Sequence, residues 1–222
     1  FILSISEIYQ QFIVDIHRTT LLEYLAVLFG IVSVWYSRKE NILVYPIGLA
    51  NTVPYVYISI RGSLFGEASV NLYYTIMNIY GWILWAKKNK QNEHIVVITW
   101  SNKKEWIQEI LFFAVFYIAI FSALTYLKKD FASGAGAIPW ADAFASSTAF
   151  TAMWLMARKK VESWYWWIAT NIASIPLYFV KHYVVTSIYY VILLAMAFWG
   201  LKEWIKRANK RIIEKESLPE WK

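Results

Sequence analysis

Five aromatic and polar side chains recur at helical spacing within WYWWIATNIASIPLY. Trp164, Trp167, Asn171, Ser174 and Tyr178 are separated by three, four, three and four residues, which places them on one face of a helix. An amide in apolar surroundings is costly unless it has a partner, so we expect this face to look inward. Indole and phenol rings attract flat or cationic ring systems, and an amide binds hydroxyl groups. The spacing therefore predicts a binding surface for a small heterocyclic solute.

Other apolar stretches carry the same kinds of side chain. Asn71, Tyr74 and Asn78 share one helical face, with the spacing three and four. Asn51 stands in an earlier stretch shortly before a proline, and Tyr190 stands in the last stretch. Together these residues describe a cavity lined by amides, hydroxyl groups and aromatic faces. In the alternative interpretation, the indoles belong to the membrane interface and the amides only join helices.

Ionisable side chains are missing from the centres of these stretches. Each Asp and Glu lies in a loop, near an end of a stretch or toward a terminus, and the histidines His17, His94 and His182 lie outside the centres too. A proton relay or an ion-coupled site needs such groups at membrane depth. The sequence contains no cysteine, so thiolate metal sites are excluded. We therefore expect uncoupled movement of an uncharged or softly cationic solute, with no metal and no cofactor.

The composition is that of an integral membrane protein. Of the 222 residues, 59% are hydrophobic and 17% are charged, whereas a soluble domain has about 25% charged residues. Apolar stretches of about 20 residues, the length that crosses a bilayer, alternate with charged residues. The net charge of +7 lies between these stretches and after the last one, which argues against nucleic acid as a partner. The predicted spans are residues 21–36, 41–60, 68–86, 107–127, 138–157, 162–180 and 184–205.

Two parts of the chain resemble each other. Arg38 to Asn51 aligns without a gap with Arg158 to Asn171, and Gly81 to Lys88 parallels Gly200 to Arg207. We predict an all-α membrane fold with seven transmembrane helices, in which two parallel three-helix repeats are joined by a linker helix. The predicted segments are an amphipathic N-terminal segment at 1–20, the first repeat at 21–88, a cytoplasmic loop and linker helix at 89–130, the second repeat at 131–207 and a basic tail at 208–222.

The positions of Lys and Arg predict the orientation. Seventeen of them fall on one side of the predicted spans and five on the other, namely Arg18, Arg61, Lys128, Lys129 and Lys181. Basic residues favour the cytoplasmic side. We therefore expect the N-terminus outside and the C-terminus in the cytoplasm.

Three other functions are weaker interpretations. Ser133 within SGAGA resembles a glycine-flanked nucleophile, but no histidine lies at a comparable depth to activate it, so we do not expect an enzyme. A retinal-type receptor needs a lysine midway along its last helix, and Lys202 lies at the end of that stretch. A channel shares the polar lining of a carrier, and saturable uptake distinguishes the two.

The motif W-x2-W-x3-N-x6-Y, from Trp164 to Tyr178, is similar to that of the PnuC vitamin transporters. SVWYSRKEN (residues 33–41), NIYGWILW (residues 78–85) and ARKK (residues 157–160) also resemble this family. The resemblance runs from about residue 21 to residue 204. It implies a seven-helix fold related to the SWEET sugar transporters and a homotrimer in the bacterial inner membrane.

The resemblance also implies a substrate, namely nicotinamide riboside. In this family the vitamin moves by facilitated diffusion and is trapped by intracellular phosphorylation. Trp167 and Asn171 are the residues that we expect to contact it. Two positions depart from the family: Tyr45-Pro46 replaces Trp-Pro, and Asn71 replaces a Gln. Close relatives carry thiamine or riboflavin, so the identity of the vitamin stays open at this point.

Overall fold

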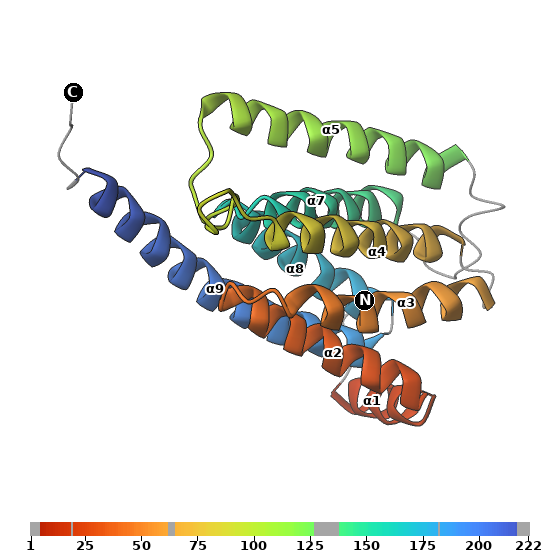
Figure 1. Ribbon diagram of the computed structural model, residues 1–222. Coiled ribbons are helices and arrows are strands. Elements are labelled where there is room, and N and C mark those ends of the chain that lie inside the picture. Colours follow the sequence, from red (N-terminus) through yellow and green to blue (C-terminus); the bar gives the residue numbers. More distant parts are fainter. Residues whose placement is uncertain (1–4, 19, 62–64, 127–137, 182, 217–222) are drawn as a thin grey trace.

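The structure is a computed structural model that describes residues 5–18, 20–61, 65–126, 138–181 and 183–216 (Figure 1). Within these ranges the regular structure is helical, apart from two isolated β-bridges. Ser133, Lys128 and Lys129 lie outside the described residues. The helices are α1 (Ile5–Arg18), α2 (Leu21–Arg38), α3 (Val44–Arg61), α4 (Phe65–Ala86), α5 (Lys103–Tyr126), α7 (Pro139–Ala157), α8 (Ser163–Val180) and α9 (Val184–Glu216).

Each of the seven predicted spans corresponds to one of the seven helices labelled between α2 and α9. The predicted and observed ends differ by at most four residues, except in α9, which continues from the predicted end at residue 205 to Glu216. Its added turns carry the ion pairs Arg207–Glu203 and Lys210–Glu214, both between side chains four residues apart, a spacing that supports a helix. By length and mean hydropathy, α5 and α9 are each able to cross a membrane.

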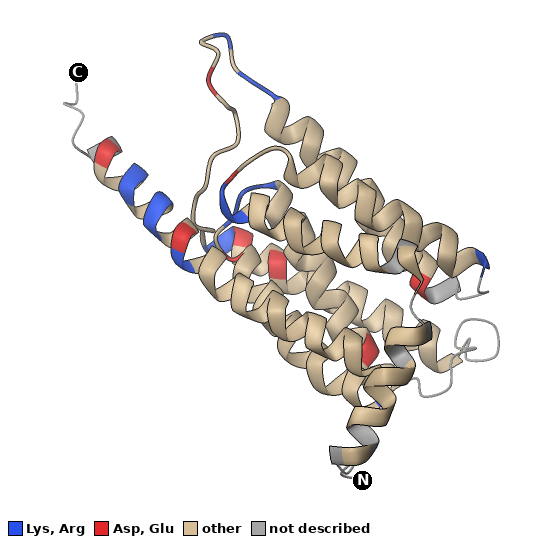
Figure 2. Cartoon of the chain, turned by 90° about the horizontal axis from the view of Figure 1, so that it is seen from below, with Lys and Arg blue, Asp and Glu red and all other residues tan. Residues whose placement is uncertain are grey.

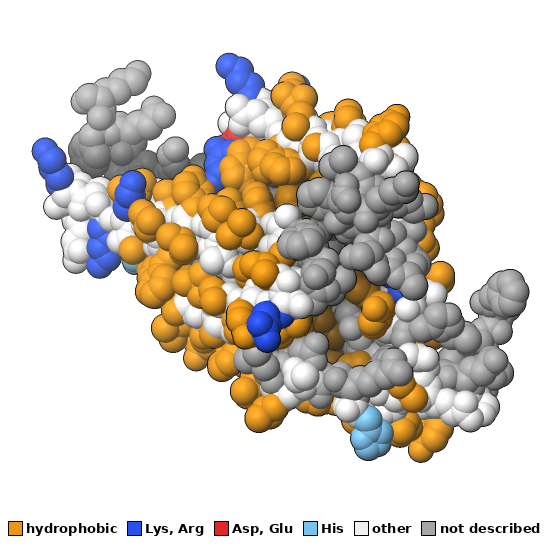
Figure 3. Space-filling view, turned by 90° about the vertical axis from the view of Figure 1, so that its right-hand side faces the viewer, with side chains coloured by type: hydrophobic (Ala, Val, Ile, Leu, Met, Phe, Trp, Pro, Cys, Tyr) orange, Lys and Arg blue, Asp and Glu red, His pale blue; other side chains and the backbone are white. Residues whose placement is uncertain are grey.

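Six of the helices form a closed ring. Each packs on the next in the order α2, α3, α4, α7, α8 and α9, and α9 packs back on α2. This order places α3 and α8 on opposite sides of the ring. Outside it, α5 packs on α7 and α1 packs on α9 (Figure 1). Hydrophobic side chains cover much of the outer surface (Figure 3), as expected where lipid is the solvent.

Most of the lysines and arginines gather at one end of this ring (Figure 2). We call it the basic end: α2, α4 and α7 end there, and α3 and α8 begin there. Two tight turns mark it. Glu40, between α2 and α3, has φ 58°, and Lys159, between α7 and α8, has φ 54°. This left-handed conformation ends a helix and allows the chain to reverse.

Local features recur at a spacing of 119 residues, one fewer than in the alignment that pairs Asn51 with Asn171. One pair is formed by the two left-handed turn residues Glu40 and Lys159. Three further pairs lie in or against one packed cluster at the basic end, namely Tyr45 and Trp164, Gly81 and Gly200, and Trp85 and Trp204. The structural register therefore pairs Asn171 with Thr52, and the sequence alignment is corrected by one residue.

Candidate functional site

Asn171 lies buried on α8, where the sequence predicts an inward-facing amide. It is 2% exposed, and its Oδ1 atom has no hydrogen-bond partner in the structure. Ser174, almost one turn further along α8, is 1% exposed. Buried polar atoms in native proteins are nearly always satisfied, by protein, water or ligand. The unpaired oxygen therefore makes Asn171 able to accept a hydrogen bond from a bound solute.

A group of tyrosines continues the polar surface away from the basic end. Tyr178 of α8 stacks on Tyr190 of α9, with 5.2 Å between ring centroids and 17° between planes. Tyr190 also hydrogen-bonds to Tyr178 and to Ser174. Tyr74 of α4 is close enough to interact electrostatically with Tyr190. Three helices of the ring thus bring aromatic faces and hydroxyl groups together, as the sequence predicts.

The two predicted tryptophans lie nearer the basic end. Trp164 is fully buried and belongs to the core, where its ring contacts Trp204 edge-on at 5.6 Å between centroids. A Cβ atom added at Gly200 would lie 2.3 Å from the Trp164 ring, so the glycine is needed for this close approach. Trp167 is partly buried against the same cluster. These contacts give Trp164 a packing role and leave Trp167 as the indole nearer to Asn171.

The remaining predicted amides have partners or close neighbours within the protein. Asn51 Nδ2 donates to the Ala26 carbonyl oxygen at 2.6 Å, which joins α3 to α2. Asn71 Nδ2 donates to the Glu67 carbonyl oxygen at 3.0 Å, on its own helix. Asn78 is buried against Gly48. The structure therefore separates Asn171, whose oxygen is unpaired, from Asn51 and Asn71, whose amide groups bind backbone.

Two indoles close the basic end, and neither was predicted as a functional residue. Trp85 Nε1 donates to the Ala157 carbonyl oxygen at 3.0 Å, and Trp204 Nε1 donates to the Ser37 carbonyl oxygen at 3.1 Å. Both rings are buried, together with Ile98 from the segment between α4 and α5. The bonds lie at the two places where the α2–α4 helices meet the α7–α9 helices. The side chains of Trp85, Trp204 and Ile98 thus form an apolar layer at the basic end, next to Trp164 and Trp167, and we call this layer the floor.

Two carboxylates are buried at the same end. Glu109 of α5 is 0% exposed and accepts a hydrogen bond from Trp166 Nε1 at 3.1 Å. Glu162, next to the start of α8, is 1% exposed and accepts one from the Ser101 backbone N–H at 2.8 Å. Both stand near helix ends, as predicted for the carboxylates. Among the described residues there is no group of three Asp, Glu, His or Cys side chains able to hold a metal ion.

A cavity of about 340 Å³ lies outside the ring rather than at its centre. It is lined by Tyr80 and Leu84 of α4, by the following segment, and by Arg158 and Lys160. It contains none of the nine predicted binding residues. Its two cations already pair with Glu105, at 3.5 Å for Arg158 and 2.8 Å for Lys160. This cavity is therefore not the predicted binding site.

Comparisons with known proteins agree with this architecture. The family described as nicotinamide mononucleotide transporter matches residues 20–206. The nicotinamide riboside transporter PnuC of Escherichia coli (strain K12) is 26% identical over 208 residues, which cover 86% of this chain and 87% of that protein. The riboflavin/roseoflavin transporter RibM of Streptomyces davaonensis is 24% identical over 185 residues, with 82% and 83% covered. The crystal structure of the vitamin B3 transporter PnuC has the same fold, with a TM-score of 0.68, 23% identity, and 91% and 88% of the two chains covered.

Proposed function

Because the chain belongs to the nicotinamide mononucleotide transporter family, we propose that it carries nicotinamide riboside across the bacterial cytoplasmic membrane. Two of its relatives, from Escherichia coli and Neisseria mucosa, are named nicotinamide riboside transporters, each 26% identical to it. The single observation that carries the proposal is the unpaired, buried Asn171 oxygen on a face shared with Trp167 and Tyr178. An amide acceptor suits a ribose hydroxyl, and the aromatic faces suit a flat cationic ring.

The charge of the site favours the riboside over the mononucleotide in the family's description. A phosphate group is normally bound by Arg, Lys or backbone N–H groups. The nine predicted residues are Trp, Tyr and Asn, and none carries a positive charge. A phosphorylated substrate would therefore lose water without gaining a cationic partner, whereas a riboside needs only hydroxyl and ring contacts.

The same residues support transport without ion coupling. Coupling needs an ionisable group that the transported solute and a proton or metal ion both affect. The buried carboxylates Glu109 and Glu162 lie at the basic end, away from Tyr178 and Tyr190. We propose facilitated diffusion, with phosphorylation inside the cell trapping the product.

Riboflavin is the second candidate, because the relative RibM is named for it. Riboflavin is a larger, uncharged ring system, so it needs more stacking surface and no cation–π contact. A direct comparison of binding constants for the two vitamins separates these candidates.

We also propose how the helices are arranged and oriented in the membrane. In it, α2 to α9 supply seven crossings, α2–α4 and α7–α9 are the two repeats, and α5 is the linker. The basic end faces the cytoplasm, because the order of the predicted spans assigns seventeen of the Lys and Arg residues to that side. The exposed apolar side chains of α5, such as Ile107, Leu111 and Ile118, suit lipid or the neighbouring subunit of a homotrimer.

Tryptophan fluorescence of the purified protein tests the substrate. The titration uses nicotinamide riboside, nicotinamide mononucleotide, riboflavin and thiamine in turn. We expect quenching by nicotinamide riboside, and weaker binding by about 2- to 13-fold in Asn171→Ala, the equivalent of one net hydrogen bond of about 0.5–1.5 kcal/mol. Gln108→Ala, which removes an exposed amide on α5, is the matched control. Tighter binding of riboflavin, or unchanged binding in Asn171→Ala, contradicts the proposal.

A further inference from the structure

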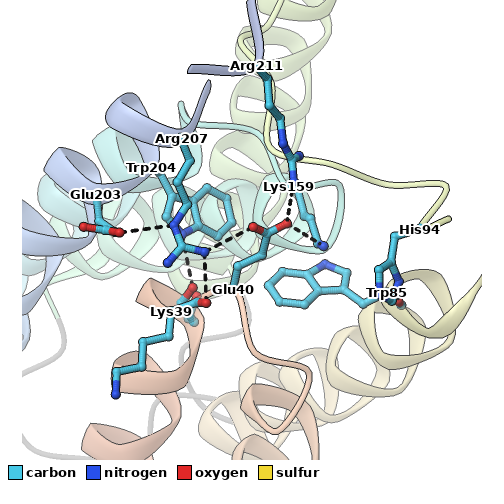
Figure 4. Close-up of polar contacts among 10 residues, drawn as sticks. Lys39, Glu40, Trp85, His94, Lys159, Glu203, Trp204, Arg207 and Arg211 are labelled. Carbon is cyan, nitrogen blue, oxygen red and sulfur yellow. Dashed lines mark hydrogen bonds and ion pairs between the residues drawn. The ribbon is translucent and has the colours of Figure 1, made fainter. Parts of the chain in front are cut away.

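A buried ion pair joins the two turns at the basic end (Figure 4). Lys159 Nζ donates to Glu40 Oε1 at 2.8 Å, and the two side chains are only 5% and 13% exposed. Arg207 Nη1 approaches the other carboxylate oxygen of Glu40 at 3.3 Å, and Arg211 Nη2 lies 3.6 Å from Oε1. One carboxylate thus faces three cations.

Every one of these contacts crosses from one group of helices to the other. Glu40 belongs to the α2–α3 turn, whereas Lys159, Arg207 and Arg211 belong to the α7–α8 turn and to α9. Arg207 also donates to the Lys39 carbonyl oxygen at 3.1 Å. The network therefore holds α2–α4 to α7–α9 without contributing to the packing inside either group.

The ion pair is also tied to the apolar floor. Lys159 Nζ lies 4.4 Å from the centroid of the Trp85 ring, a cation–π contact. Trp85 in turn packs at 6.3 Å between ring centroids from Trp204. If the turns separated, Lys159 would leave the ring and both indole bonds across the helix groups would be exposed to water. Opening of the ion pair and opening of the floor are therefore one event.

The energetics favour a switch over a permanent support. Burial lowers the pKa of Lys159, and the hydrogen bond to Glu40 offsets part of that effect. A buried ion pair gains little net stability, because desolvation opposes the attraction, but its geometry is highly specific. Such a pair costs little to exchange for hydrated charges, which suits a contact that breaks and reforms.

We propose that Glu40, Lys159, Arg207 and Arg211 form an electrostatic gate, which closes the basic end of the ring and opens in each transport cycle. This inference rests on the proposed transport function. A carrier with its site between two helix groups must open each end in turn, and the described basic end is closed by this network and the floor above it. Neutral residues in its place would leave the end open for a larger share of the time.

Chemical labelling of a buried position measures the open state. The sequence has no cysteine, so Met156→Cys places a unique thiol in the buried cluster behind the gate. In the full-length protein we measure how fast a hydrophilic maleimide modifies this thiol. We expect labelling at least about fivefold faster when Glu40→Gln or Lys159→Gln is added, a typical size for a conformational coupling. Glu214→Gln is the matched control, because its ion-pair partner Lys210 lies on the same helix and outside the gate.

Charge reversal makes the test specific for the ion pair. Glu40→Lys and Lys159→Glu should each speed labelling, and the double reversal should label more slowly than either single variant, since it restores one attractive pair. Raising the salt concentration screens the ion pairs, so it should speed labelling of the Met156→Cys thiol more when the gate residues are unaltered than when Glu40→Gln is added.

Two results would overturn the gate. One is labelling of Glu40→Gln and Lys159→Gln at the rate of the Glu214→Gln control, which would make the pair a static support. The other is a double reversal that labels as fast as the single reversals. Should Glu40→Gln fail to fold, Arg207→Gln and Arg211→Gln remove the outer partners at half-exposed positions, and the same rates decide. These measurements need no ligand, so failure of the vitamin titration would leave them interpretable.

Discussion

The two ends of the helix ring are held together in different ways. At the basic end, indole bonds and the Glu40–Lys159 pair cross from α2–α4 to α7–α9. At the other end, the described ion pair joins Asp142 to Lys181, and both belong to α7–α9. The Tyr178–Tyr190 stack and the Thr75–Thr52 hydrogen bond likewise each stay within one group. Between the two ends, Tyr73 of α4 donates to the Phe150 carbonyl oxygen of α7 at 2.9 Å, a contact between the groups without charge.

This difference indicates which contacts have to change during transport. Bonds inside a group can persist while the two groups move relative to each other, but bonds between groups cannot. The described ion pairs that resist separation of the two groups therefore lie at the basic end, while contacts within α7–α9 hold Tyr178 and Tyr190 together at the opposite end. We conclude that variants at the two ends should act on different measurements, namely opening and stability at one end and affinity at the other.

The largest effect should come from filling the close contacts at the basic end. A Cβ atom at Gly81 would lie 2.3 Å from the Tyr45 ring, and one at Gly200 equally close to the Trp164 ring. We expect Gly81→Ala and Gly200→Ala each to destabilise the protein by about 1–3 kcal/mol, because a packed core resists added volume. Thermal unfolding in detergent measures this change.

Gly30→Ala is the comparison from outside this cluster. Its added methyl group meets the Tyr189 hydroxyl, the far end of a side chain, at 2.4 Å. Because a side-chain tip moves more easily than a buried ring, we expect a smaller loss of stability. Equal losses at the three glycines would show that the basic end is not packed more rigidly than the rest.

The sequence predicted the helices and the fold more fully than the contacts between distant residues. Hydrophobic stretches broken by charged turns predicted the helices closely, since charged residues lie between successive helices or at their ends. The all-helical fold and the transporter family are confirmed. The spacing around Asn171 also predicted a buried amide, and the structure buries it.

Long-range contacts could not be predicted in the same way. Glu40 and Lys159 lie 119 residues apart, and nothing local in either turn indicates its partner. The sequence alignment of the two halves is displaced by one residue because it matches identical residue types, Asn51 and Asn171. The turn residues that set the structural register, Glu40 and Lys159, differ in type. Ile98, in the short apolar run at residues 95–98 after α4, is fully buried in the cluster at the basic end. The sequence of this run has no periodic pattern to indicate that this one side chain packs into the core.

The next largest effect should come from removing one indole bond between the helix groups. Trp204→Phe keeps an aromatic ring but removes the indole hydrogen bond to the Ser37 carbonyl oxygen, which keeps the Glu40 backbone N–H as its other donor. We expect a loss of about 0.5–1.5 kcal/mol from the lost hydrogen bond and faster labelling of the Met156→Cys thiol. Trp106→Phe, on the exposed side of α5, is the control. A stability loss without faster labelling would separate the floor from the gate.

A smaller effect should distinguish the two asparagines that the sequence placed in equivalent positions. Asn171→Ala should weaken vitamin binding by about 2- to 13-fold and change stability little, because its oxygen has no partner in the protein. Asn51→Ala should instead lower the melting temperature, because it breaks the bond to the Ala26 carbonyl oxygen. Fluorescence titration and thermal unfolding of both variants give the comparison. The opposite pattern would exchange their roles.

The smallest effect concerns how α5 is attached at the basic end. The Glu105 carboxylate accepts a hydrogen bond from Lys160 at 2.8 Å and pairs with Arg158 at 3.5 Å. Burial alone would raise its pKa, but the bond from Lys160 and the nearby charges outweigh burial, so the pKa of Glu105 lies below its usual 4.5. A lowered folded-state pKa contributes stability above the unfolded value, and that contribution is lost as the pH falls through the folded-state value.

We therefore expect the unfolding temperature to fall as the pH drops below about 4.5, and to fall less steeply in Glu105→Gln, which has already lost the contribution. Glu93→Gln, in the exposed segment after α4, should follow the unaltered protein. Parallel curves for all three proteins would mean that the Glu105 ion pairs do not hold α5, which is then held by its apolar contacts with α7 and by the Trp166–Glu109 hydrogen bond. In that case the charged contacts that matter at the basic end are confined to those that cross between the two helix groups of the ring.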